Sequence, residues 1–267
     1  MNDLAKVTIL GVRGSMVMSG AGFVRYGGAS SCILLQIAGE TIFLDAGSGI
    51  SGYKSQRNAE NMHILISHSH IDHIIGFLSF APLFYAEQRC HIYGKSRGGL
   101  TIKEQLLTLI SPPLWPTGLE SFPAELIFHG IDDSFHIGEV AIDSLESNHP
   151  GGSTVYKITY GDKKIVYATD FEHDEYQTPK LAEFAADCSL LIYDAMFFDD
   201  EYPPYMGWGH STVNEGLKLK QLSNSKRMLL FHHSPDHNDL MLDRAQEKIS
   251  RIDENCSFAK CGEEIFL

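Results

Sequence analysis

The stretch ILISHSHIDHIIGF, residues 64–77, contains three histidines and an aspartate within six consecutive positions, directly after an apolar run. If the apolar run is a buried strand, these side chains lie on the loop at its end and at the start of the next helix. His68 and His70 are two residues apart, so they project to the same side of an extended segment. Asp72 and His73 follow at the predicted helix start. Imidazoles combined with a carboxylate suit zinc or manganese, so the stretch predicts a metal site.

Short runs rich in Val, Ile and Leu lie on both sides of this stretch, and Gly, Asp or His closes most of them. The predicted strands are residues 6–12, 30–39, 40–47, 62–68, 124–130, 139–149, 154–161, 163–170 and 188–195. The predicted helices are residues 72–87, 98–110, 178–187, 211–223 and 236–251. We therefore expect an α/β protein in which two sheets pack together with helices outside. The proline-rich segment 111–123 predicts an ordered surface loop that acts as a lid.

Composition limits the class of protein. A chain of 267 residues with 43% hydrophobic residues can bury one large core, so we expect a single domain over residues 1–267. The net charge of −13 argues against a broad basic footprint for duplex nucleic acid. No apolar run reaches the roughly 18 residues that span a bilayer, so we expect no membrane association. Five cysteines without a CxxC pair, and no export signal, predict reduced thiols and a cytoplasmic location.

The sequence HSHIDH at 68–73 matches the HxHxDH signature of the metallo-β-lactamase superfamily, and other segments resemble that family in the same order. These segments are LGVRGS at 10–15, FLDAG at 43–47, SNHPGG at 147–152, YATD at 167–170 and LLFHHS at 229–234. The resemblance spans nearly the whole chain. It implies an αβ/βα four-layer sandwich, with two mixed sheets, helices outside and a dinuclear metal site at one edge.

The same resemblance assigns ligands to two divalent ions, with zinc preferred and manganese as the alternative. His68, His70 and His149 would bind one ion, Asp72, His73 and His232 the other, and Asp170 would bridge them. His233 stays an alternative to His232, because neighbouring residues in a strand point opposite ways. Asp45 would orient a ligand or cap a turn. Two such ions lower the pKa of a shared water and stabilise a displacement at phosphorus, which predicts a hydrolase.

The motif GWGHST at 207–212 resembles the GHST motif of the tRNase Z branch, where a histidine outside the metal ligands assists phosphodiester cleavage. His210 would donate a proton to the leaving oxygen or stabilise charge there, and the next two residues can also cap a helix. His210 and Asp72 are the candidate catalytic residues. Secreted β-lactamases of this fold commonly have cysteine at the position of Asp170, so antibiotic hydrolysis is not expected.

In tRNase Z a long arm that grips tRNA typically lies between the third histidine ligand and the bridging aspartate. Here residues 149–170 leave room only for two strands and a turn. We therefore predict a phosphodiesterase, dimeric by family resemblance, for a small, cyclic phosphodiester such as a cyclic nucleotide. Aromatic residues that could stack on a base are Trp115, Phe197, Phe198, Tyr202, Tyr205 and Trp208. The alternatives are a tRNase Z-like RNA 3′-end endonuclease, a lactonase or thioesterase, and a metal-binding protein without activity.

Overall fold

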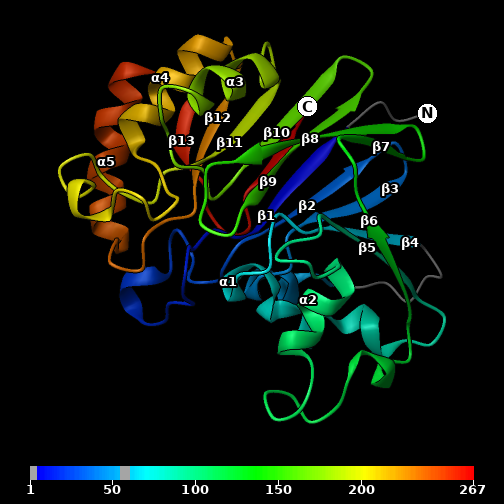
Figure 1. Cartoon of the computed structure of the whole chain (residues 1–267). Coiled ribbons are helices and arrows are strands. Elements are labelled where there is room, and N and C mark those ends of the chain that lie inside the picture. The colour runs from blue at the N-terminus through cyan, green and yellow to red at the C-terminus, as the bar shows by residue number, and fades with distance from the viewer. Residues whose placement is uncertain (1–4, 55–60) are drawn as a thin grey trace.

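The computed structural model describes residues 5–54 and 61–267, and these form two mixed sheets that pack face to face (Figure 1). In spatial order, the first sheet contains β14 (Glu264–Phe266), β1 (Lys6–Gly11), β2 (Cys32–Ile37), β3 (Glu40–Leu44), β4 (Asn61–Leu65), β5 (Arg89–Gly94) and β6 (Glu125–Gly130). The second contains β13 (Cys256–Phe258), β12 (Met228–Phe231), β11 (Leu190–Asp194), β10 (Lys163–Ala168), β9 (Ser153–Tyr160), β8 (Val140–Ser147) and β7 (Ser134–Ile137). Strands β3 to β6 are parallel, and so are β10 to β13.

Helices cover the outer face of each sheet (Figure 1). They are α1 (Ile71–Ile74), α2 (Ile102–Leu109), α3 (Gln177–Phe184), α4 (Val213–Ser223) and α5 (Asp239–Ile252). The first two lie on the first sheet, and the other three lie on the second. The predicted α/β four-layer sandwich is therefore confirmed.

Three buried apolar clusters correspond to the three interfaces between the layers. Ile42 and Ile158 lie in the cluster between the two sheets. Phe77 and Leu106 belong to the cluster beneath the first sheet, and Leu242 to the one above the second sheet. Burial of this apolar surface is the main favourable contribution to folding.

The helix predicted over residues 72–87 is wrong. After α1 the chain forms two short 3₁₀ segments, Ile75–Ser79 and Ala81–Phe84. Gly76 approaches so closely that a Cβ there would lie 1.9 Å from the carbonyl oxygen of Gly47. The chain is thus held against the turn after β3, and Pro82 also disfavours a continuous helix. Tertiary contact here overrides the helical spacing of the apolar residues.

The other helix predictions are close to the observed bounds, and their ends follow local capping. The side chain of Thr101 accepts a hydrogen bond from the backbone of Glu104 at the start of α2. Thr212, not Ser211, caps α4, and Asn238 caps α5, which begins three residues later than predicted. These side chains satisfy backbone N–H groups that a helix start leaves free.

The proline-rich segment 111–123 forms a loop that contains one 3₁₀ turn, Leu119–Ser121. Its residues Leu119 and Phe122 are buried in the cluster beneath the first sheet, whereas Leu114 is exposed. The ring of Phe122 contacts Phe77 and Phe84 edge to face. The base of the loop is therefore anchored to the core.

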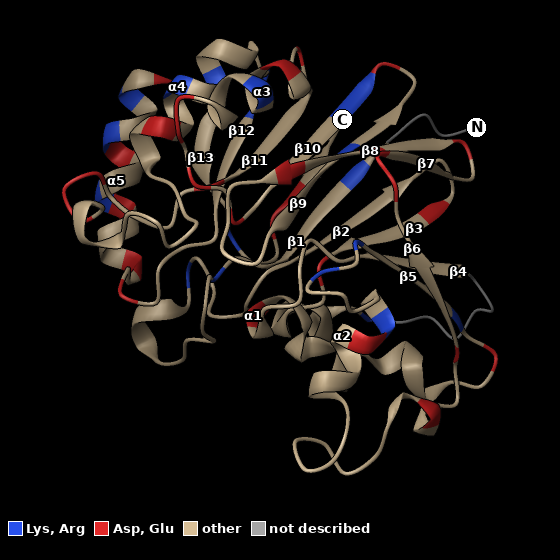
Figure 2. Ribbon diagram, in the orientation of Figure 1, with Lys and Arg blue, Asp and Glu red and all other residues tan. Residues whose placement is uncertain are grey.

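No helix within residues 5–54 and 61–267 is long and apolar enough to cross a lipid bilayer. All five cysteines are free thiols. In the described part of the chain, Lys and Arg are scattered over helices and strands and do not gather in one stripe (Figure 2).

Candidate metal centre

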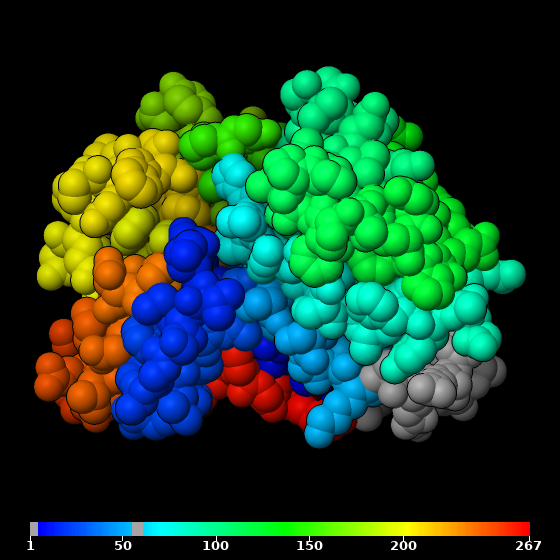
Figure 3. Space-filling model, turned by 90° about the horizontal axis from the view of Figure 1, so that it is seen from below, coloured from blue at the N-terminus to red at the C-terminus, as the bar shows by residue number. Residues whose placement is uncertain are grey.

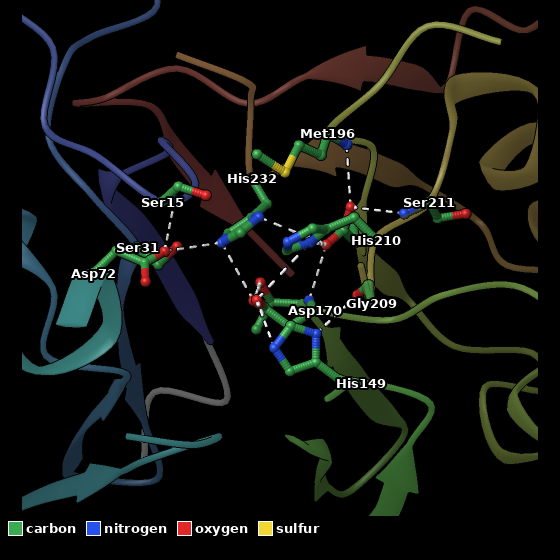
Figure 4. A network of polar contacts seen from close by, with 12 residues as sticks. Ser15, Ser31, Asp72, His149, Asp170, Met196, Gly209, His210, Ser211 and His232 are labelled. Carbon is green, nitrogen blue, oxygen red and sulfur yellow. Dashed lines mark hydrogen bonds and ion pairs between the residues drawn. The ribbon is translucent and has the colours of Figure 1, made fainter. Parts of the chain in front are cut away.

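Ligand-type side chains gather at one edge of the sandwich because each follows the carboxyl end of a strand. Asp45 follows β3, and residues 68–73 follow β4 on the same sheet. On the other sheet, His149 follows β8, Asp170 follows β10 and His232 follows β12. The carboxyl ends of parallel strands meet at one edge of a sheet, where ligands commonly bind. Facing edges of the two sheets thus bring distant segments together (Figure 4).

The first group comprises His68, His70, His149 and Asp170, which offer ligand atoms within 4.8 Å of one another. His149 Nε2 lies 3.1 Å from His70 Nδ1. His68 Nε2 and His149 Nε2 each lie 3.7 Å from Oδ1 of Asp170. His68 and His70 project to the same side, since their ring centroids lie 4.4 Å apart.

The second group comprises Asp72, His73 and His232. Nε2 of His73 and Nε2 of His232 lie 3.2 Å apart, and each is 3.2 Å from Oδ2 of Asp72. Both nitrogens also lie close to Oδ2 of Asp170, at 3.0 and 3.2 Å. The two carboxylate oxygens of Asp170 therefore face different groups.

His233 lies outside both groups. Its Nε2 donates to the carbonyl of Ala259 at 2.9 Å, and its ring contacts Tyr26 and Phe258 edge to face. His232 turns toward the cluster instead, because its backbone has φ = 63°. Asp45 and Asp170 also have positive φ, 60° and 52°. Such strain in residues other than glycine collects at functional sites.

Asp45 orients a histidine of the second group. Its Oδ2 accepts a hydrogen bond from His73 Nδ1–H at 2.7 Å, from Tyr167 at 2.8 Å and from the hydroxyl of Ser67 at 2.8 Å. Its Oδ1 accepts from the backbone N–H of Ser67. These contacts fix the tautomer of His73 so that Nε2 faces the cluster. Of the two roles that the sequence left open for Asp45, orientation fits these contacts.

His210 lies beside both groups and is held by Asp194. Its Nδ1–H donates to Oδ2 of Asp194 at 2.9 Å, and its ring is 5.0 Å from that of His232 and 5.4 Å from that of His149. Sequence reasoning missed Asp194, which is the last residue of β11 and is fully buried. A sequence pattern could have indicated Asp194, because YDA at 193–195 ends an apolar strand in the same way as LDA at 44–46.

Glu172 was also missed, and it holds the segment that precedes His210. Its carboxylate accepts hydrogen bonds from the hydroxyl of Tyr202 and the backbone N–H groups of Gly207 and Gly209. Gly209 in turn accepts from His149 Nδ1–H at 3.0 Å. A Cβ at Gly209 would lie 2.0 Å from that nitrogen, so only glycine permits this approach. Glu172 thereby connects the 201–209 segment to a histidine of the first group.

The donor set fits divalent metal ions. Nε2 of His68 is buried, has no hydrogen-bond partner among residues 5–54 and 61–267, and points toward Asp170. The ion-pair partners of the buried carboxylates Asp72 and Asp170 are histidines. A buried carboxylate requires a cationic partner or a metal. Imidazole nitrogens and carboxylate oxygens around a shared point match what zinc and manganese bind.

The electrostatics of the cluster keep its carboxylates ionised. Burial opposes ionisation of Asp170, but His232 and His73 hold its pKa well below the usual value. Burial lowers the pKa of His68 strongly, which leaves a neutral ring able to ligate. For His210, burial acts against protonation, yet Asp194 raises its pKa to about 9.

Comparisons with known proteins agree with this chemistry. A family model described as "Beta-lactamase superfamily domain" matches residues 41–233. The probable metallo-hydrolase YhfI of Bacillus subtilis is 25% identical over 243 residues, covering 88% of this chain and 90% of its own. Ribonuclease Z of Nitrosopumilus maritimus is 24% identical over 255 residues, covering 78% and 85%. The protein is therefore a metal-dependent hydrolase. It belongs to the β-lactamase superfamily.

Solved structures show the same fold. The crystal structure of YhfI superposes with a TM-score of 0.75 at 22% identity and covers 100% of both chains. A diphosphatase from the PhnP family superposes with a TM-score of 0.72 at 17% identity, covering 99% of this chain and 97% of its own.

Proposed function

We propose that the two groups bind two divalent ions. His68, His70 and His149 would hold one ion, Asp72, His73 and His232 would hold the other, and Asp170 would bridge them. The support is that Oδ1 of Asp170 faces the first group and Oδ2 faces the second. Zinc is the preferred ion and manganese the alternative. Divalent cations at these positions supply a Lewis acid and lower the pKa of nearby water.

We infer that the substrate is a small phosphodiester, and a cyclic one such as a cyclic nucleotide fits best. The observation that carries this inference is His210, held beside the cluster by Asp194. Because Nδ1–H of His210 is engaged with Asp194, Nε2 is the atom left to donate a proton to the leaving oxygen. A lactone or thioester hydrolase would not need this histidine.

Asp72 is the second proposed catalytic residue. Its Oδ2 accepts the backbone N–H of Ser15 at 2.7 Å and lies next to the histidines of the second group. The segment after β1 thus holds this carboxylate in one orientation. We propose that Asp72 also orients the attacking water.

RNA 3′-end cleavage is the competing function, because one of the relatives reported above is a ribonuclease Z. The short chain segment between His149 and Asp170 favours a small diester as the substrate. Strand β9, a two-residue turn and β10 fill this segment, so an arm that grips tRNA has no place there.

Four further proposals follow from the sequence. We propose that residues 1–267 form one domain, that 111–123 acts as a lid, that the protein is a homodimer and that it is cytoplasmic. Exposed Leu114 at the tip and buried Phe122 at the base of the loop suit a lid that moves on an anchored hinge.

The test incubates the metal-loaded protein and its His210→Ala variant with 3′,5′- and 2′,3′-cyclic nucleotides and separates the products by chromatography. Ring opening by the wild type, at least 100-fold slower in the variant, is expected. If all cyclic nucleotides are returned intact while a precursor tRNA or a lactone is cleaved, the proposed substrate class is wrong.

A further inference from the structure

Four exposed apolar residues stand on segments that carry or adjoin residues of the metal centre, and we call them the apolar rim: Met16, Ile71, Met206 and Trp208. Ile71 is 54% exposed and stands between His70 and Asp72 in the sequence. Met16 follows Ser15, whose N–H contacts Asp72, and Trp208 precedes Gly209, whose carbonyl contacts His149. The blue segment after β1, the cyan segment of α1 and the yellow segment before α4 lie side by side on one face (Figure 3).

A series of aromatic rings connects the rim to His210. The ring of Phe197 is 6.2 Å from His210 and stacks on Tyr205 at 4.5 Å with an angle of 5°. Tyr205 contacts Trp208 edge to face at 5.2 Å. Trp208, at the outer end, is 59% exposed. Glu172 fixes the backbone on both sides of Trp208, so the indole is presented from a rigid segment.

The segments that form the site carry no lysine or arginine. These segments are residues 14–24, 68–88, 147–156, 169–179, 195–217 and 229–243. The nearby Arg13 is fully buried and donates to backbone carbonyls, and Arg97 is paired with Glu146. Cationic side chains neutralise the phosphates in nucleic-acid binding, and these segments carry none.

We propose that the apolar rim binds an uncharged aromatic or apolar group on one ester arm of the substrate. This inference rests on the proposed diesterase function and narrows its substrate class. The substrate carries its negative charge at the diester itself, which the metal centre neutralises, and its flat or apolar arm lies against Trp208. Further phosphates on that arm weaken binding, because the segments of the site carry no lysine or arginine to pair with them.

The test compares two diesters with the same leaving group, phenyl 4-nitrophenyl phosphate and methyl 4-nitrophenyl phosphate. Stacking of a base or aryl ring on an aromatic side chain changes affinity by roughly 5- to 150-fold. We expect the phenyl diester to have a KM about tenfold below that of the methyl diester. Trp208→Ala removes this preference by raising KM for the phenyl diester, and Trp208→Phe keeps most of it. The control is Leu222→Ala, an equally exposed residue near the end of α4, and it keeps the wild-type preference.

A second pair of substrates tests whether added negative charge on the bound arm weakens binding. Adding a 3′-phosphate to thymidine 5′-(4-nitrophenyl phosphate) is expected to raise KM several-fold. A lower KM with the added phosphate overturns the inference. Equal KM values for the phenyl and methyl diesters in the wild type also overturn the inference. If both diesters are hydrolysed, that result leaves the proposed diesterase function intact.

A binding measurement separates this inference from the proposed function. Diphenyl phosphate, added to the metal-loaded protein, is expected to change tryptophan fluorescence more than dimethyl phosphate, and Trp208→Ala removes the difference. If this holds while no diester is hydrolysed, the diesterase function fails and the apolar binding site stands. No difference between the two phosphates counts against the site.

Discussion

The substitution Asp45→Asn tests how the second group of ligands is oriented. Asp45 accepts four hydrogen bonds, three of them at Oδ2, from Ser67, His73 and Tyr167. The amide nitrogen meets the backbone N–H of Ser67 if it takes the Oδ1 position, and three donors if it takes the Oδ2 position. The two hydroxyls can rotate, but His73 can adapt only by exchanging tautomers, and its Nε2 then carries the proton. A protonated Nε2 cannot bind a metal.

The contacts of Asp45 set the expected loss of stability and the expected loss of metal affinity. Hydrogen bonds to a charged group contribute about 1.5–3 kcal/mol each, and the mismatch at His73 leaves one buried bond without compensation. We therefore expect the free energy of unfolding of the metal-free protein to fall by about 3 kcal/mol. Loss of a side chain that orients a metal ligand lowers metal affinity by about 10- to 100-fold. Asn tolerates the positive φ at position 45, so backbone strain does not add to either effect.

The assay measures zinc affinity by competition with a chelator and stability by urea unfolding of the metal-free protein. The matched control is Asp143→Asn, where a partly exposed carboxylate pairs with Lys157 and Ser134. This control should lose less than about 1 kcal/mol and keep its zinc affinity. If Asp45→Asn binds zinc as tightly as the wild type, the proposed tautomer control is wrong.

Three further predictions concern other groups. Asp194→Asn should lower kcat for a diester by about 100-fold, because the bond that holds His210 is weakened; unchanged kcat would remove Asp194 from the mechanism. Glu172→Gln should raise KM and speed limited proteolysis within 201–209, since an amide nitrogen replaces an acceptor that holds Gly207 or Gly209; an unaltered cleavage rate would contradict this. Burial, with repulsion from His91 and His129, lowers the pKa of His63 to about 4. The unfolded chain therefore binds this proton more tightly than the folded one. The stability that the neutral His63 ring contributes is complete above about pH 6.5 and is lost as the pH falls toward 4. The free energy of unfolding should fall by about 2 kcal/mol between pH 7.5 and 5. Urea unfolding of the wild type and His63→Leu at both pH values should show this difference, and equal pH dependence would refute it.

The sequence predicts most of the site because its ligands follow strands. HSHIDH at 68–73 joins one strand to one short helix, so local spacing already brings its four side chains together. His149, Asp170 and His232 come from other strands, and only their order along the chain, matched to a known family, connected them to the first cluster.

Contacts between distant segments explain what the sequence did not predict. Asp194 acts on a histidine 16 positions later, and Glu172 binds backbone groups 35 and 37 positions away. Neither spacing produces a local pattern. The helix predicted over 72–87 failed for the same reason, since the approach of Gly76 to Gly47 is a tertiary contact. The short strands β7, β13 and β14 have three or four residues each, too few for a periodic pattern.

The most direct test of the account measures hydrolysis of bis(4-nitrophenyl) phosphate by chelated protein, before and after addition of zinc or manganese. We predict no hydrolysis after chelation and full recovery with about two ions per chain, and Asp170→Asn should not recover. Hydrolysis that persists in the chelated protein, or a reloaded protein that cleaves a lactone but no diester, would contradict a metal-dependent phosphodiesterase.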